Sequence, residues 1–228
     1  MRMLAVFEKS ERIRHIGHLD IQRSVQRGLR RSGLPVAYSQ GFNPHILVTF
    51  ASALSTGACG RREIMDVTMA EETDPKEFVR KMNLSMPPEM QLSEARVLDN
   101  KHPSLMGLVA AADYNLLIRD RETAEKISSV IPDLMAEERI ITLRKTKTKL
   151  LECDIKPLIL SLNAEDQEGF IHLHCMLVLN EKESCKPQML LEALKAKAGL
   201  TEEGRMLVIR EGLYGTDENG HLVPLENL

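Results

Sequence analysis

Aromatic side chains are scarce in this sequence, which has no tryptophan, three tyrosines and five phenylalanines among 228 residues. RNA-binding modules of the RRM type stack bases on aromatic rings and carry an RNP signature, and no such signature occurs here. Any contact with nucleic acid is therefore expected to use phosphates and shape rather than base stacking of that kind.

Long apolar runs are absent as well. No stretch of about 18 apolar residues occurs, so no helix is expected to span a bilayer. At the N-terminus, Glu8 and Lys9 follow only a few apolar residues, which is too early for the apolar segment of a signal peptide. We expect a cytoplasmic protein.

Cysteines are few and widely spaced: Cys59, Cys153, Cys175 and Cys185 stand 94, 22 and 10 positions apart. Zinc and iron–sulfur sites need closer clusters of ligands, and no C-x-x-C pair exists. The motifs G-x-x-x-x-G-K-[ST], G-x-G-x-x-G and G-x-S-x-G are also missing. We therefore expect reduced, buried thiols, no metal and no cofactor.

Charge is distributed unevenly along the chain. The whole sequence has a net charge of -3, but residues 1–62 hold ten basic and three acidic side chains, a net charge of +7. The remaining residues carry 20 basic and 30 acidic side chains, a net charge of -10. A basic first quarter indicates that an anionic partner binds there.

The order of predicted elements repeats once along the chain. Strands at 2–8, 46–52, 62–70 and 91–98 alternate with helices at 18–32 and 75–84, the second capped by Asp74 with Pro75 at its first position. The second set has strands at 114–119, 139–147, 170–179 and 206–213 and helices at 122–130 and 187–198, with an insert at 149–168. The segment 100–104 is the candidate linker.

This pattern predicts an α+β protein made of two tandem ferredoxin-like (βαββαβ) domains at 1–102 and 103–228. In that arrangement the helices cover one face of each antiparallel sheet. The other face is expected to be available.

The predicted helix at 18–32 has two distinct faces at about 100° per residue. Apolar and small residues gather on one face, and Arg23, Arg27, Arg30 and Arg31 on the other, with Asp20 near the N-terminal end. Four like charges that close together repel unless an anion faces them, and arginine suits phosphate. The alternative is a solvated face paired with carboxylates from elsewhere in the chain.

The loop that follows the helix is rich in polar and aromatic groups: Tyr38, Gln40, Phe42, Asn43 and His45. His18, Asp20 and His45 are candidate catalytic residues, because histidine is an acid or base near neutral pH. The other interpretation is that His18 and Asp20 cap the helix and tie it to the loop at 40–45. His15 and His18 lack a third ligand for a metal.

A second basic segment lies at 139–149 and has no acidic residue. On a strand, Lys145 and Lys147 would point to one face, where they could contact phosphate. Lysines on a strand edge also deter aggregation, so both interpretations stay open.

Several of these segments together match a known family: Gly17-His18-Leu19-Asp20, the arginines from Arg27 to Arg31, and the run from Tyr38 through Phe42-Asn43-Pro44 to His45. The chain resembles the radical SAM-linked proteins, a bacterial family of unassigned activity that is fused to, or encoded beside, cobalamin-binding-type radical SAM proteins. The match is densest over residues 2–70. Gly17 stands where the family usually has serine.

The resemblance implies a partner rather than a reaction, because the chain lacks the C-x-x-x-C-x-x-C motif of a radical SAM enzyme. The leading hypothesis is a non-catalytic module that binds structured RNA (tRNA or rRNA) for a cobalamin-type radical SAM partner. Its interface residues would be Arg23, Arg27, Arg30, Arg31, Tyr38, Gln40, Phe42, Asn43, His45, Lys145 and Lys147. The alternatives are a protein–protein adaptor that docks the radical SAM enzyme and a metal-independent RNA-processing enzyme that uses histidine.

Overall fold

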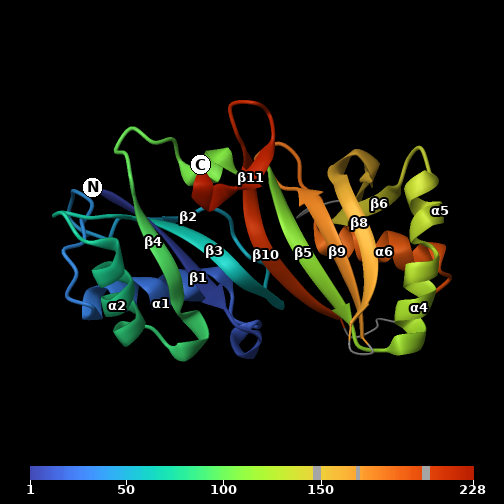
Figure 1. Cartoon of the computed structure of the whole chain (residues 1–228), viewed down its shortest axis with the longest axis horizontal. Helices are drawn as coiled ribbons and strands as arrows, with labels where there is room; N and C mark the ends of the chain where they lie inside the picture. Colours follow the sequence, from blue (N-terminus) through green and yellow to red (C-terminus); the bar gives the residue numbers. More distant parts are fainter. Residues whose placement is uncertain (146–149, 168–169, 202–205) are drawn as a thin grey trace. The chain divides into compact units, whose positions relative to one another are not determined.

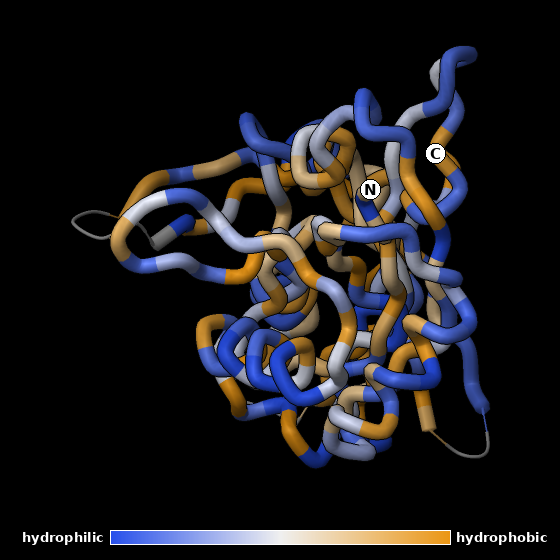
Figure 2. The backbone as a smooth tube through the Cα atoms, turned by 90° about the vertical axis from the view of Figure 1, so that its left-hand side faces the viewer, coloured by the Kyte–Doolittle hydropathy of each residue, from blue (hydrophilic) through white to orange (hydrophobic). Residues whose placement is uncertain are grey.

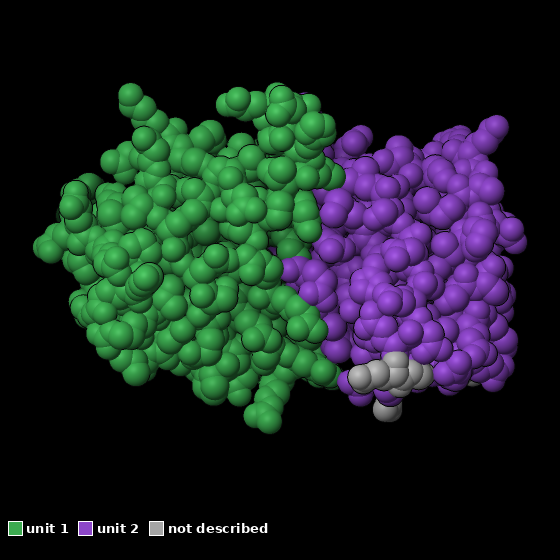
Figure 3. Space-filling model, in the orientation of Figure 1, with its two compact units in different colours: residues 1–109, 212–228 green, residues 110–211 purple. Residues whose placement is uncertain are grey.

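The computed structural model describes residues 1–145, 150–167, 170–201 and 206–228 (Figure 1). These residues form two compact units (Figure 3): unit 1 comprises Met1–Val109 and Gly212–Leu228, and unit 2 comprises Ala110–Glu211. The first boundary lies near the expected one at 102/103. The last residues differ from the expected division, because they belong to unit 1 rather than to the second domain.

Unit 1 is an antiparallel sheet with the strand order β4-β1-β3-β2 and two helices in its connections. Its elements in chain order are β1 (Arg2–Lys9), α1 (His18–Arg31), β2 (Val48–Phe50), β3 (Ala58–Thr68), α2 (Pro75–Ser85), β4 (Leu92–Leu98) and the short helix α3 (Leu105–Leu108). The strand β11 (Leu222–Pro224) pairs with the end of β10 (Met206–Thr216). All six elements expected for this part are present, and β2 is shorter than its predicted range.

The helices of unit 1 cover one face of the sheet. Side chains alternate between the two faces of a strand, and Met3, Ala5 and Phe7 of β1 share a core with Val25 of α1 and Phe78 of α2. In Figure 2 the helical parts of the tube alternate between hydrophilic and hydrophobic colours, as expected for helices with one buried face. This core fixes α1 so that its opposite face points outward.

Part of the second face of this sheet is covered, which corrects the expectation that the whole face is available. Leu4 and Val6 point to that face and are buried. The C-terminal segment is bonded there: Arg62 of β3 donates to Glu226 at 2.7 Å, and Arg96 of β4 donates to the carbonyl oxygen of Leu228. The sequence pattern did not reveal this because the partners are more than 100 positions apart.

The helix α2 begins as predicted. Asp74 accepts a hydrogen bond from the backbone N–H of Glu77 at 3.0 Å, and Pro75 occupies the first helical position. An N-cap carboxylate satisfies a backbone donor that the helix itself cannot pair. The local sequence therefore determines where this helix starts.

Unit 2 contains one more hairpin than expected. Its elements are β5 (Ala111–Ile118), α4 (Arg121–Ser129), α5 (Ile131–Ala136), β6 (Ile141–Lys145), β7 (Leu150–Asp154), β8 (Ile159–Gln167), β9 (Phe170–Val178), α6 (Pro187–Lys197) and the first part of β10 (Met206–Thr216). The strand β9 pairs antiparallel with β5 on one side and β8 on the other, and β10 is the second neighbour of β5.

The predicted strand at 139–147 does not join this sheet. Within that range Ile141–Lys145 form β6, which pairs with β7 in a two-stranded sheet among the described residues, and β8 from the expected insert lies beside β9 instead. Asp154 accepts from the backbone N–H groups of Ile140 and Lys156 at 3.0 and 3.1 Å and so fixes the base of the hairpin. β6 and β7 are close in the sequence, and pairing between segments close in the sequence costs less chain entropy than pairing between distant ones.

Together the two units define an α+β fold with a mostly antiparallel sheet. No helix within the described ranges is both long enough and apolar enough to cross a membrane.

Candidate functional site

The helix α1 presents the arginine face that its sequence predicts. Ile21, Val25, Gly28 and Leu29 are its buried residues, and they lie on the sheet side. Gly28 is packed against α2: a Cβ at this position would lie 2.4 Å from Sδ of Met86. The apolar side is therefore fixed in place, and the arginines are held on the outside.

The four arginines differ in what they contact. Arg23 is paired with Asp20 at 2.9 Å, and Arg31 donates to the carbonyl oxygen of Ser85 at 2.6 Å. Arg27 and Arg30 have no hydrogen-bond or ion-pair partner among the residues that the structure describes. The alternative of a face neutralised by carboxylates from elsewhere therefore fails for these two arginines.

A hollow of about 420 Å³ lies at the junction of α1 and the end of α2. It is lined by Ser24, Arg27, Arg31, Ser85, Met86 and Pro87. Arg27 and Arg31 are one helical turn apart, and none of the lining residues is acidic. The hollow offers guanidinium and hydroxyl donors without a competing carboxylate, which is the chemistry that a phosphate group requires.

The loop after α1 is closed by its own hydrogen bonds. Tyr38 and Ile46 form an isolated bridge, the backbone N–H of Ser39 donates to the carbonyl oxygen of His45 at 2.8 Å, and Oγ of Ser39 lies 2.8 Å from Nδ1 of His45. Phe42 at the tip is 106% exposed. Gln40 and Asn43 are exposed as well. These side chains are therefore accessible from outside the protein.

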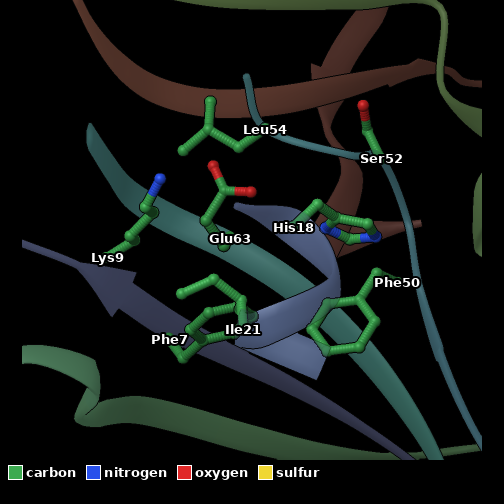
Figure 4. A pocket seen from close by; sticks show the side chains of 8 residues that line it. All are labelled: Phe7, Lys9, His18, Ile21, Phe50, Ser52, Leu54 and Glu63. Carbon is green, nitrogen blue, oxygen red and sulfur yellow. The ribbon is translucent and has the colours of Figure 1, made fainter. Parts of the chain in front are cut away.

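His18 lines a small pocket on the helix-covered side of the sheet (Figure 4). Its ring meets Phe50 edge-on at 5.3 Å, and its Nε2 lies 3.1 Å from Nε2 of Gln22. The cavity is about 10 Å³, which is room for about one water-sized molecule. His18 is therefore a packed residue at the start of α1.

The helix-cap interpretation of His18 and Asp20 is wrong. Gly17 is the N-cap residue and has no side chain with which to cap the helix, while Asp20 is paired with Arg23. His45 bonds Ser39 of its own loop. The three candidate catalytic residues thus have three different partners.

The same pocket contains two charged residues that the sequence did not single out. Lys9 and Glu63 are 2% and 4% exposed, and Figure 4 shows both side chains pointing into the pocket. Nζ of Lys9 donates to the carbonyl oxygen of Arg14 at 3.0 Å. Lys9 ends β1 and Glu63 lies within β3, and charged residues inside predicted strands were the available signal, because buried charges need specific partners.

In unit 2, the predicted second basic segment is only partly described. Lys145 ends β6, and Lys147 lies outside the described residues. His172 and His174 share a face of β9, with stacked rings whose centroids are 6.2 Å apart. Nδ1 of His172 lies 3.1 Å from Oδ1 of Asn115.

The four thiols are free. Cys59, Cys175 and Cys185 are buried, as predicted, and Cys153 is partly exposed. Burial raises the pKa of Cys59, Cys175 and Cys185, in the last case to about 12. Thiols of this kind stay protonated and react poorly near neutral pH.

The fold and the described surface define an α+β protein with an exposed basic face on α1, where Arg27 and Arg30 have no described partner. The chain belongs to the family described as "Uncharacterized protein conserved in bacteria (DUF2344)", which matches residues 2–187. No curated protein matches the sequence. One solved structure, described as "Crystal structure of putative glycine cleavage system transcriptional repressor", is 10% identical and aligns over 92% of this chain and 98% of its own length, with a TM-score of 0.22.

Proposed function

We propose that unit 1 is an RNA-binding module that contacts the phosphate backbone of structured RNA (tRNA or rRNA) through α1 and presents that RNA to a cobalamin-type radical SAM partner. The observation that carries the proposal is the absence of any described partner for Arg27 and Arg30. Both lie on an exposed face whose neighbours include further arginines. An anion from outside the chain would relieve the repulsion between them.

Two further features support this proposal. The hollow beside Arg27 and Arg31 accommodates a phosphate group without an acidic neighbour. The fully exposed Phe42 and the half-exposed Tyr38 lie in the loop that follows α1 in the chain, where an aromatic ring can stack on a splayed base. Arg27 and Arg31 of the hollow and the aromatic residues Tyr38 and Phe42 all belong to the segment 17–45, which carries the resemblance to radical SAM-linked proteins.

We extend the proposal to the fold. Unit 1 has the strand order β4-β1-β3-β2, and unit 2 has the order β10-β5-β9-β8, with a helix after the first and third strand of each set. This is the split βαβ arrangement of ferredoxin-like domains, with the hairpin β6-β7 inserted into the second. A fold of this kind places α1 on the outside of its sheet.

The direct test measures binding of total bacterial tRNA to the full chain at 50 to 200 mM salt. Affinity should fall steeply with salt, and the double variant Arg27→Glu, Arg30→Glu should bind at least tenfold more weakly with a reduced salt slope. The control is Arg121→Glu, Lys126→Glu on α4, which changes the net charge equally. Salt-insensitive binding, or equal losses in both variants, would refute the proposal.

The adaptor hypothesis is the second candidate, because a phenylalanine that is 106% exposed also suits a protein interface. Nuclease treatment separates the two. A complex with the radical SAM partner that survives removal of RNA and is lost in Phe42→Ser supports the adaptor. Dissociation on nuclease treatment supports the RNA module.

A further inference from the structure

A second hollow, also of about 420 Å³, lies on the face of the unit 1 sheet opposite α1 and α2. The strand register explains its composition: Arg2 is opposite Thr68, and Asp66 is opposite Thr49, so these four side chains share one face. Ser104, which precedes α3, and His45 also line the hollow. All of these residues belong to unit 1.

Asp66 is the unusual member of this set. Its residue is 8% exposed, and it interrupts an otherwise apolar stretch of β3. Both Nε and Nη2 of Arg2 donate to the same oxygen, Oδ2, at 3.0 and 2.5 Å. Oδ1 is buried and has no hydrogen-bond partner among the described residues. A buried carboxylate oxygen without a donor is costly, and an N–H group from a ligand would satisfy it.

The other groups in the hollow determine which ligand would fit. Arg2 is already engaged, since it also donates to the carbonyl oxygens of His102 and Pro103. The remaining polar groups are the hydroxyls of Thr49, Thr68 and Ser104, which both donate and accept, and the imidazole of His45, whose Nδ1 lies 2.8 Å from Oγ of Ser39. A phosphate would lack a free lysine or arginine here. A neutral, flat ligand with N–H donors beside acceptors matches the set.

We propose that this hollow binds a guanine base, with Asp66 accepting an N–H of its Watson–Crick edge at Oδ1. Guanine has adjacent N–H donors and a neighbouring carbonyl acceptor, whereas adenine places a ring acceptor where the donor is needed. The volume is in the range of small-ligand sites. The base belongs either to a free guanine nucleoside or to an RNA nucleotide, and in the second case the inference rests on the proposed function.

The experiment is a calorimetric titration of the full chain with guanosine, adenosine and cytidine. Guanosine should bind saturably and at least tenfold more tightly than the other two. Asp66→Asn replaces Oδ1 with an amide N–H while its carbonyl oxygen still accepts from Arg2, so it should lose at least tenfold in guanosine affinity. Absence of saturable guanosine binding, equal affinity for adenosine, or an unchanged Asp66→Asn variant overturns the inference.

Thermal unfolding shows whether Asp66→Asn is folded. If it is not, a second variant tests guanosine binding to the hollow. Thr68→Val removes one hydroxyl from the hollow without changing the shape of the side chain, and should weaken guanosine binding three- to tenfold. Thr73→Val, outside the hollow, is its control and should bind normally. Equal guanosine affinity in these two variants overturns the inference.

A guanine-containing trinucleotide distinguishes the two sources of the base. Tighter binding than guanosine, lost in Asp66→Asn, indicates an RNA nucleotide. Equal binding indicates a free nucleoside. Failure of the proposed function would appear as unchanged tRNA binding in the arginine variant while guanosine still binds, so the two ideas fail separately.

Discussion

Arg31 donates a hydrogen bond from Nη2 to the carbonyl oxygen of Ser85 at 2.6 Å, and this bond joins the last turn of α1 to the last residue of α2. The same side chain lines the basic hollow. Arg31 therefore has a structural contact in addition to its charge, whereas Arg30 one position earlier has no described partner.

Because Arg31 has a hydrogen bond within the protein and Arg30 has no described partner, substitutions of the two residues should affect stability differently. Arg31→Met should lower both the free energy of unfolding, by roughly 0.5–1 kcal/mol for one lost hydrogen bond, and the affinity for tRNA. Arg30→Met should lower the affinity alone. Urea unfolding and tRNA titration of both variants measure the two effects. Equal stability losses would contradict the assignment of the Ser85 contact to Arg31.

Gly28→Ala should destabilise the protein, although alanine is the better helix former. The added Cβ would lie 2.4 Å from Sδ of Met86, so Met86 must move or α1 must shift. Overpacking of this kind costs about 1–3 kcal/mol, against a gain of about 1 kcal/mol from helix propensity. Urea unfolding is the measurement, with Gln26→Ala on the same helix as control. A stabilised Gly28→Ala variant would show that the contact relaxes freely.

The thiols should differ in reactivity. In the native protein at pH 8 one of the four, Cys153, should react quickly with a thiol reagent such as DTNB, because the others are buried with a raised pKa. All four should react after denaturation. Cys153→Ser should remove the fast phase and leave the slow one. A fast phase that persists in this variant would mean that a buried thiol is accessible.

Asp154 should make the unfolding free energy depend on pH in the acid range. The backbone N–H of Ile140, then that of Lys156 and the guanidinium of Arg139, lower the pKa of its carboxyl below the ordinary value near 3.8. Its stabilising contribution is therefore complete above that value and disappears as the pH falls through the lower folded-state pKa.

The test of this dependence is urea unfolding of wild type and Asp154→Asn from pH 7 to pH 2. The wild type should be the more stable at pH 7, and the difference should shrink below about pH 4 as the carboxyl of the wild type is protonated. Asp133→Asn serves as control. A difference that stays constant across this range would exclude the ionised carboxylate as its cause.

Local sequence signals determined a large part of unit 1. The cap formed by Asp74 and Pro75 fixed the start of α2, and the spacing of Ile21, Val25 and Leu29 fixed the buried face of α1 and thereby the outward arginines. These features depend on residues within a turn or two of one another. Periodicity and capping are therefore sufficient to predict them.

The choice among possible strand partners needed the tertiary structure. Residues 139–147 have the sequence of a strand, and we expected them in the main sheet of unit 2. Instead β6 pairs with β7, and β8 is the strand that pairs with β9. Alternating side chains identify a strand but not its neighbour, because pairing depends on loop closure and on the packing of both faces.

The sequence by itself determined the α+β class, the basic face of α1 and the polar loop after it, because each depends on composition or short-range periodicity. Only the tertiary structure placed the C-terminal segment on the first sheet and Asp66 beside Arg2, 64 positions away. It also showed that His18 packs on Phe50 instead of facing Asp20 or His45. These outcomes depend on long-range register and burial, which no local pattern encodes.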